Sequence, residues 1–301
     1  MGFGCAHLIG VVSWRKSLAL LECAYENGIR HFDVAPMYGF AEAEKCLGAF
    51  LKRHACDTTV TTKFGILPGK RQSLFRAVRS LSRPLLKPLK GIFLPKSITV
   101  PKTSLSMCFD VDLAAKSLDK SLLNLKTDHV HIFLLHEVAN QDIKDDRLLR
   151  FLEDAVSAGK IGTFGVGSDA AKISELVQHR PEYCRVTQYQ SSLVDVPKNV
   201  QVPFQIHHGI FNERLMNFCN QLQNDAAKCK KWSDLLGCDV FDITVLSGLI
   251  CRATLLSDPK SIILMSSTSL ERIARNCRYA SDKLIDNSAK KFHQLLMQSH
   301  L

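Results

Sequence analysis

Segments with the spacing of strands alternate with segments with the spacing of helices along almost the whole chain. Residues 17–27, for example, place Leu18 and Leu21 on one face of a helix. This helix is expected to stop at Gly28, because glycine readily takes the left-handed conformation that ends a helix. Such alternation is typical of a parallel sheet or barrel built from βα units.

Eight strands can be drawn in this way, and 301 residues suit a single (β/α)8 barrel, which commonly takes about 250. Apolar parallel strands also fit a doubly wound open sheet. No GxGxxG segment follows the first strand, which disfavours a dinucleotide-binding open sheet. We therefore predict one barrel domain over residues 1–301. Its strands are expected at 2–6, 29–35, 58–63, 129–135, 162–167, 185–190, 204–208 and 261–265.

A long insertion, residues 66–109, interrupts the alternation after the third predicted strand. It holds five prolines, so only a short helix, 73–81, is expected there. Residues 66–107 carry basic side chains and no Asp or Glu, although the net charge of the whole chain is +10. A solvated cationic loop and a surface for an anionic ligand both fit. We hypothesise that this segment covers part of a substrate pocket.

The composition, 46% hydrophobic and 23% charged, is that of an ordinary globular protein. No apolar run reaches the roughly 18 residues of a membrane span, and the N-terminus lacks the pattern of a secretory signal. The eleven cysteines are scattered without a CxxC pair, as is typical of reduced thiols. We expect a cytoplasmic protein without a membrane span, and no nucleic-acid partner.

Four polar residues stand at or just after the ends of predicted strands, where a (β/α)8 barrel builds its active site. They are Asp33, Tyr38, Lys63 and His136. A lysine ammonium beside a phenol favours the phenolate, and a carboxylate keeps that lysine charged. A histidine in the same pocket can orient a substrate oxygen. Taken singly, a structural ion pair, a core histidine and a packed tyrosine fit equally well.

A metal-dependent hydrolase on the same barrel is a rival interpretation, because His129 and His131 are spaced as HxH and His207 is followed by another histidine. The HxH pair, however, lies at the start of the fourth predicted strand. This end of a barrel is associated with stability, whereas only His136 reaches the catalytic end. We therefore expect no metal site.

The segments that carry these residues resemble those of a known family. GIRHFDVAPMYG, VTTKFG and HIFLLH resemble the aldo-keto reductase segments that bear an Asp, Tyr, Lys and His tetrad. AGKIGTFGVGSD, VTQYQ and SIILMSSTSLERIARN resemble later segments of the same family. The short first strand and the Phe-Asp-x-Ala-Pro-x-Tyr-Gly wording are most similar to its bacterial aldose or aryl-alcohol dehydrogenase branch.

This resemblance implies that Asp33, Tyr38, Lys63 and His136 are catalytic, with Tyr38 as general acid in carbonyl reduction and general base in alcohol oxidation. It implies an NADP(H)-dependent oxidoreductase acting on a small aldehyde, ketone or sugar. A nicotinamide cofactor would supply the hydride. A non-catalytic nicotinamide-binding regulatory protein on the same fold is the alternative.

The resemblance also implies a set of cofactor-binding residues. Gln188 and Ser168 would hold the nicotinamide carboxamide, although Gly167 replaces the family's usual serine and leaves Asp169 as a further candidate acceptor. At strand seven, where an aromatic side chain is common, this chain offers histidines. Residues that match the grip on the adenosine 2′-phosphate and adenine are Ser267, Ser269, Arg272 and Asn276.

NADPH is favoured over NADH, because an arginine suits a phosphate. Two positions depart from the family: Ser266 stands where a lysine is often found, and Arg275 where an acidic residue is common. The substrate, the reaction direction and the oligomeric state are left open by the sequence.

Overall fold

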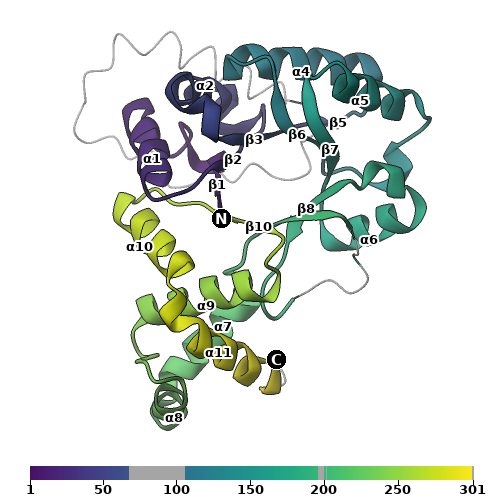
Figure 1. Cartoon of the computed structure of the whole chain (residues 1–301). Coiled ribbons are helices and arrows are strands. Elements are labelled where there is room, and N and C mark those ends of the chain that lie inside the picture. Colours follow the sequence, from purple (N-terminus) through teal and green to yellow (C-terminus); the bar gives the residue numbers. More distant parts are fainter. Residues whose placement is uncertain (68–105, 196–199, 201, 300–301) are drawn as a thin grey trace, which may run out of the picture.

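The structure is a computed structural model that describes residues 1–67, 106–195, 200 and 202–299. Eight parallel strands close into a barrel at its centre (Figure 1). β1 pairs on one side with β2 and on the other with β10, which completes the circle. The predicted (β/α)8 fold is therefore confirmed. The barrel strands are β1 Gly2–Gly4, β2 His31–Asp33, β3 Thr59–Phe64, β6 Val130–His136, β7 Ile161–Gly167, β8 Val186–Gln190, β9 Phe204–His208 and β10 Ile262–Met265.

Helices surround this barrel, and the first of them agrees with the helix predicted over residues 17–27. They are α1 Trp14–Glu26, α2 Ala43–His54, α4 Val111–Leu125, α5 Arg147–Ser157, α6 Ala170–His179, α7 Glu213–Asn224, α9 Ile243–Ser257 and α10 Leu270–Ser281. Two more, α8 Ala226–Leu236 and α11 Asp286–Gln298, were not predicted. Short 3-10 turns lie at Cys5–His7, Tyr38–Ala41, Ala55–Asp57, Asn140–Asp142, Pro181–Tyr183 and Lys283–Ile285.

Local sequence signals explain where several helices begin and end. The side chain of Asp110 accepts hydrogen bonds from the backbone of Asp112 and Leu113, so it caps α4. Gly28 and Gly159 follow α1 and α5 with φ of 89° and 72°, the left-handed conformation expected at these ends. β9 starts at Phe204, directly after the proline that cannot donate to a sheet.

The insertion after β3 begins and ends with a pair of short antiparallel strands. β4, Ile66–Leu67, pairs with β5, Ser106–Met107. The two ends of the insertion therefore lie side by side. The predicted helix at 73–81 and most of the basic segment fall outside the described residues.

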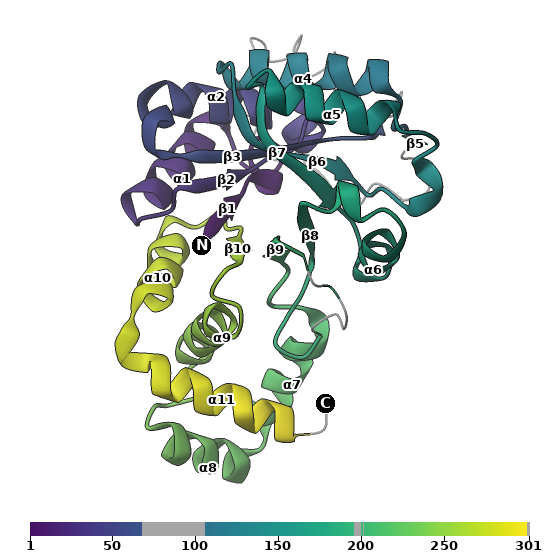
Figure 2. The ribbon, with the colours of Figure 1, turned by 45° about the vertical axis from the view of Figure 1, so that its right-hand side comes forward.

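Two hydrophobic clusters hold the helices in place. The larger one packs the outer helices from α1 to α6 against the first strands of the barrel. The other joins α7, α8, α9 and α11, which lie together at the lower side of Figure 2. In this second cluster the rings of Trp232 and Phe292 pack edge to face, with centroids 5.9 Å apart.

The connection from β8 to β9, residues 191–203, contains no helix among its described residues. The outward-facing side chains of these two strands are correspondingly polar. Tyr189 donates a hydrogen bond to Gln205 over 2.5 Å, and His207 lies 3.0 Å from Asp258. Within the described part of the chain, none of the helices is both long and apolar enough to cross a bilayer.

Candidate active site

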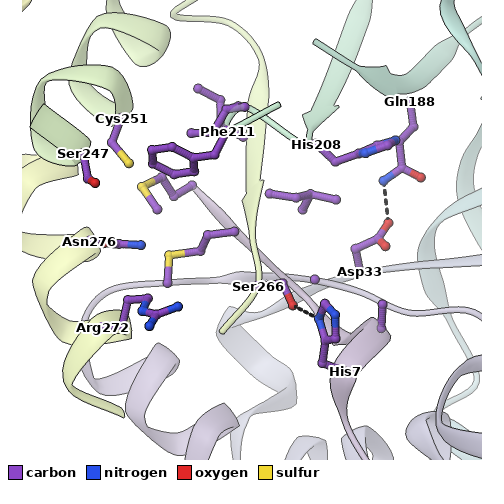
Figure 3. A pocket seen from close by; sticks show the side chains of 18 of the residues that line it. His7, Asp33, Gln188, His208, Phe211, Ser247, Cys251, Ser266, Arg272 and Asn276 are labelled. Carbon is purple, nitrogen blue, oxygen red and sulfur yellow. Dashed lines mark hydrogen bonds between the residues drawn. The ribbon is translucent and has the colours of Figure 1, made fainter. Parts of the chain in front are cut away.

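A pocket of about 820 Å³ opens at the carboxyl ends of the barrel strands (Figure 3). Eight of the ten predicted site residues line it. Ser267 and Ser269 do not. The eight are Asp33, Tyr38, Lys63, His136, Ser168, Gln188, Arg272 and Asn276.

Asp33 and Lys63 form a buried ion pair at the ends of β2 and β3. Lys63 Nζ lies 2.5 Å from Asp33 Oδ1, and the two residues are only 2% and 3% exposed. Burial has the largest single effect and lowers the pKa of Lys63, but the charges of Asp33 and Tyr38 and the hydrogen bond to Asp33 together outweigh it, so the net pKa is raised. The lysine is therefore a fixed positive charge in the pocket floor.

Tyr38 stands in a strained turn that follows β2. Gly39, Phe40 and Ala41 have φ of 56°, 58° and 66°, and non-glycine residues take this left-handed region at a cost. A Cβ on Gly39 would clash with the carbonyl oxygen of Leu8. The turn brings the Tyr38 ring centre within 5.5 Å of the Lys63 ammonium, so tyrosine and lysine meet as predicted.

Burial and the charge of Lys63 act on the pKa of Tyr38 in opposite directions. Burial raises the pKa of its phenol, and the opposing effect of Lys63 is too small to reverse the shift. Lys63 thus favours the phenolate, as expected, but burial has the larger effect on the pKa of Tyr38. Tyr38 keeps its proton at neutral pH, which makes it a proton donor.

His136 ends β6 and completes the group of four. Its ring packs edge to face with Tyr38, with centroids 6.2 Å apart. Burial, then the charges of Lys63 and His208, lower the pKa of His136 to about 3. The imidazole is therefore neutral at physiological pH and has one N–H to donate and one nitrogen to accept.

Three of the four histidines of the rival metal site do not line this pocket. His129 bonds to the backbone oxygen of Gly159, and His131 accepts from the backbone of Val60. His207 points outward to Asp258, whereas His208 lines the pocket. Over residues 1–67, 106–195, 200 and 202–299, no three or more His, Cys, Asp or Glu side chains form a group that could hold a metal ion.

Gln188 and Ser168 lie beside the ion pair at the ends of β8 and β7. Gln188 Nε2 donates to Asp33 Oδ2 over 2.8 Å. Ser168 Oγ is buried and has no hydrogen-bond partner among the described residues. Asp169, the further candidate acceptor, instead caps α6 and pairs with Lys172. A ligand that bonds to the Ser168 hydroxyl would satisfy it.

The opposite side of the pocket is formed by α10. Arg272, Arg275 and Asn276 face it from one side of the helix, and Arg275 Nε is buried without a partner in the part of the chain that the structure describes. Ser269 is the N-cap of α10, and Ser267 accepts from the backbone of Ser269. These two serines therefore shape the turn that carries the arginines.

Several lining residues were not predicted. His7, just after β1, lies with Nδ1 2.8 Å from Ser266 Oγ. Ile243, Ser247 and Cys251 line the pocket from α9. Their spacing of four places them on one helical face, and this signal was present in the sequence.

The pocket fits an elongated ligand with polar groups at both ends. In Figure 3 Asp33 and Gln188 lie on one side of it, and Arg272 and Asn276 on the other. Ser168 Oγ and Arg275 Nε, two of the buried atoms that have no hydrogen-bond partner among the described residues, belong to these opposite sides. A nicotinamide dinucleotide, with an amide at one end and phosphates towards the other, suits this distribution.

The fold and the pocket define a class of barrel proteins, and the sequence comparison identifies it. Residues 1–225 match the Aldo/keto reductase family, so the chain belongs to this family. The predicted resemblance is thereby confirmed.

Individual relatives match this chain either at low identity or over a short segment. Aldo-keto reductase AFTS1 of Alternaria alternata is 26% identical over 60% of this chain and 48% of its own length. D-threo-aldose 1-dehydrogenase of a Pseudomonas species is 42% identical over 22% of each chain. The chain thus spans about half or less of the length of these curated relatives.

Solved structures share the architecture. The glycerol dehydrogenase of Gluconobacter oxydans has a TM-score of 0.69 at 16% identity, covering 100% of this chain and 91% of its own. An aldo/keto reductase of Klebsiella pneumoniae, solved with NADP and acetate, has a TM-score of 0.58 at 16% identity, covering 98% and 90%. At such identities the likeness concerns the fold alone.

Proposed function

We propose that this protein is an NADP(H)-dependent oxidoreductase that transfers hydride between the nicotinamide and a small aldehyde, ketone or sugar. The observation that carries the proposal is the meeting of Asp33, Tyr38, Lys63 and His136 in one pocket at the carboxyl ends of the three strands β2, β3 and β6. Family membership supports the same reaction class.

In the reduction of a carbonyl group, the bound nicotinamide supplies the hydride to the carbonyl carbon. Tyr38 donates its phenolic proton to the carbonyl oxygen, which yields the alcohol and a tyrosinate. Lys63, held by Asp33, stabilises that tyrosinate until solvent returns a proton. Neutral His136 orients the substrate oxygen through its N–H. Alcohol oxidation uses the same groups in reverse.

NADPH is the proposed cofactor, with NADH as the weaker ligand. Arg272 and Arg275 place two guanidinium groups on the α10 side of the pocket, and guanidinium groups suit a 2′-phosphate. A relative from Schizosaccharomyces pombe, aldo-keto reductase yakc [NADP(+)], supports this choice. The names of two others, pyridoxal 4-dehydrogenase and D-threo-aldose 1-dehydrogenase, support aldehydes and sugars as substrates.

The variant Tyr38→Phe tests the proposal. Protein fluorescence is titrated with NADPH and NADH, and turnover is then measured with aldehydes, ketones and free sugars. We expect Tyr38→Phe to bind NADPH as the unchanged protein does but to lose about 10²- to 10⁴-fold in turnover, because the proton donor is gone. Tyr25→Phe, on the outside of the barrel, is the control and should keep its activity.

Equal turnover in Tyr38→Phe and the unchanged protein would contradict the assignment. Tight NADPH binding without turnover of any substrate would instead favour the non-catalytic, nicotinamide-binding alternative. No binding of either nucleotide would overturn both.

A further inference from the structure

Glu137 lines the pocket but takes no part in the proposed reaction. It directly follows His136, so the Cα atoms of the two residues lie about 3.8 Å apart. Its backbone N–H donates to the carbonyl oxygen of Gly167 over 2.6 Å, which holds it beside the end of β7. Glu137 therefore stands next to the imidazole that is proposed to orient the substrate oxygen.

The backbone of Glu137 is held in a strained conformation. Its φ is 62°, in the left-handed region that glycine takes freely and glutamate takes at a cost. If the backbone alone mattered, glycine would suit this position better. Strained residues of this kind gather at functional sites, where the side chain is used. The strain therefore points to a role for the carboxylate.

The carboxylate of Glu137 has one distant ionic partner in the part of the chain that the structure describes. Lys172 Nζ lies 3.8 Å from Glu137 Oε2, beyond hydrogen-bond length, and only 3.1 Å from Asp169. The Glu137 side chain is 47% exposed. An exposed pair of this kind contributes less to stability than the strained backbone costs. The carboxylate is thus open to a ligand in the pocket.

The charges that line the pocket are unevenly distributed. Asp33 and Glu137 are the two carboxylates among its described lining residues, and Lys63 balances Asp33 over 2.5 Å. The pKa values of His136 and His208 are both lowered, mainly by burial, so neither ring is charged at pH 7. The guanidinium groups belong to the α10 side. The end of the pocket at His136 therefore keeps the negative charge of Glu137.

We propose that Glu137 is a specificity-determining residue, and that the pocket takes an aldehyde or ketone with a cationic group, such as an ammonium, near its carbonyl. The carbonyl oxygen lies at Tyr38 and His136, and the cationic group lies against the Glu137 carboxylate. An anionic group in the same place is repelled. The inference rests on the proposed function and adds to it the charge of the substrate.

Three aldehydes that differ in charge test this inference. 4-(Trimethylammonio)butanal is a cation, 5,5-dimethylhexanal is its neutral isostere, and 5-oxopentanoate is an anion. The value of kcat/KM is measured for each with NADPH, because this ratio expresses specificity. The unchanged protein should prefer the cation to its isostere by about fivefold, the effect of one half-exposed charge. The anion should be the poorest of the three.

The variant Glu137→Gln should lower the preference for the cation over its isostere by about fivefold, because an amide has nearly the same shape but no charge. Glu182→Gln is the matched control. It changes an exposed carboxylate in the turn after α6 that does not line the pocket, so the preference should stay as it is.

Lys172→Gln should have the opposite effect. It removes the cation that partly balances Glu137, and Lys172 itself does not line the pocket. The preference for the cationic aldehyde should therefore rise by about twofold. A fall in this preference would contradict the inference. This variant also serves if Glu137→Gln does not fold, because it leaves the strained residue in place.

Glu137→Gly separates a role in binding from a role in folding. Glycine suits a φ of 62°, so this variant should unfold at a temperature close to that of the unchanged protein while the preference is lost. A clear loss of stability with an unchanged preference would assign Glu137 to the structure and overturn the inference.

The proposed function and this inference fail in different ways. If no carbonyl compound is turned over, the proposed function falls and this inference falls with it. If the aldehydes are turned over with equal kcat/KM, or the anion is preferred, only this inference falls. A preference for the cation that survives Glu137→Gln would overturn it equally.

Discussion

His31 is a buried imidazole that takes no part in the proposed reaction. Its two ring nitrogens lie 2.9 Å from Thr59 Oγ1 and 3.2 Å from Thr61 Oγ1. Burial lowers the pKa of His31 to about 4, although the charge of Asp33 partly opposes the shift. The ring is therefore neutral in the folded protein at physiological pH.

This burial predicts a loss of stability in acid. An unfolded histidine has a pKa of about 6.5, so its burial in neutral form disfavours folding once the pH falls below that value. The free energy of unfolding is not reduced by His31 above about pH 6.5. It falls by about 3 kcal/mol in all as the pH approaches 4. Urea unfolding of His31→Gln at pH 7.5 and 4.5 should show a smaller decline than that of the unchanged protein. Identical declines would contradict the prediction.

At the scale of single residues, the sequence predicted which side chains meet in the pocket better than it predicted their hydrogen-bond partners. The meeting of Asp33, Tyr38, Lys63 and His136 could be predicted because each stands at or just after the end of a strand, and strand ends meet in a barrel. The bond from Gln188 to Asp33 was not found, since it joins strands 155 residues apart and no local pattern encodes it. The sequence likewise did not predict that burial outweighs the effect of Lys63 on the pKa of Tyr38.

Among the elements, those with a local signal were predicted best. The strands agree within about three residues at each end, because their apolar runs are bounded by glycine, proline or charge. The helices α8 and α11 were missed although Asp225 caps α8 and Ala289, Phe292 and Leu296 form one buried face of α11. Neither helix is needed to complete eight βα units, so the alternation of strands and helices does not predict them.

The cap of α4 provides a test at this scale. Asp110→Ala removes the acceptor for two backbone N–H groups at the start of the helix. We expect a loss of about 1 kcal/mol in the free energy of unfolding, measured by urea titration. Asp110→Asn is the matched control and should lose little, because asparagine caps equally well. An equal loss in both variants would point to a role of the charge instead.

At the scale of the whole molecule, the pattern of strands and helices in the sequence could not by itself predict that the barrel closes. Apolar parallel strands fit an open sheet as well as a barrel, and only the pairing of β1 with β10 decides between them. The prediction that residues 1–301 form one domain remains a prediction.

The packing of α7, α8, α9 and α11 against one another predicts how much α11 contributes to the free energy of unfolding. Phe292 is fully buried in this cluster, whereas Met297 on the same helix is 63% exposed. Phe292→Ala should cost about 3–5 kcal/mol of unfolding free energy, and Met297→Ala should cost less than about 0.5 kcal/mol. Thermal and urea unfolding of both variants measure the difference. Similar costs would show that α11 adds little to the stability of the barrel.

The antiparallel pair of β4 and β5 brings Leu67 and Ser106 to neighbouring positions. Because the cost of closing a loop rises only slowly with its length, the barrel is nearly indifferent to how many residues join these two points. The segment between β4 and β5 can therefore be exchanged for one of another length. The barrel strands that carry the proposed catalytic residues need not change. Proteins with catalytic residues on the barrel strands can therefore vary the length and sequence of such a segment with little loss of stability.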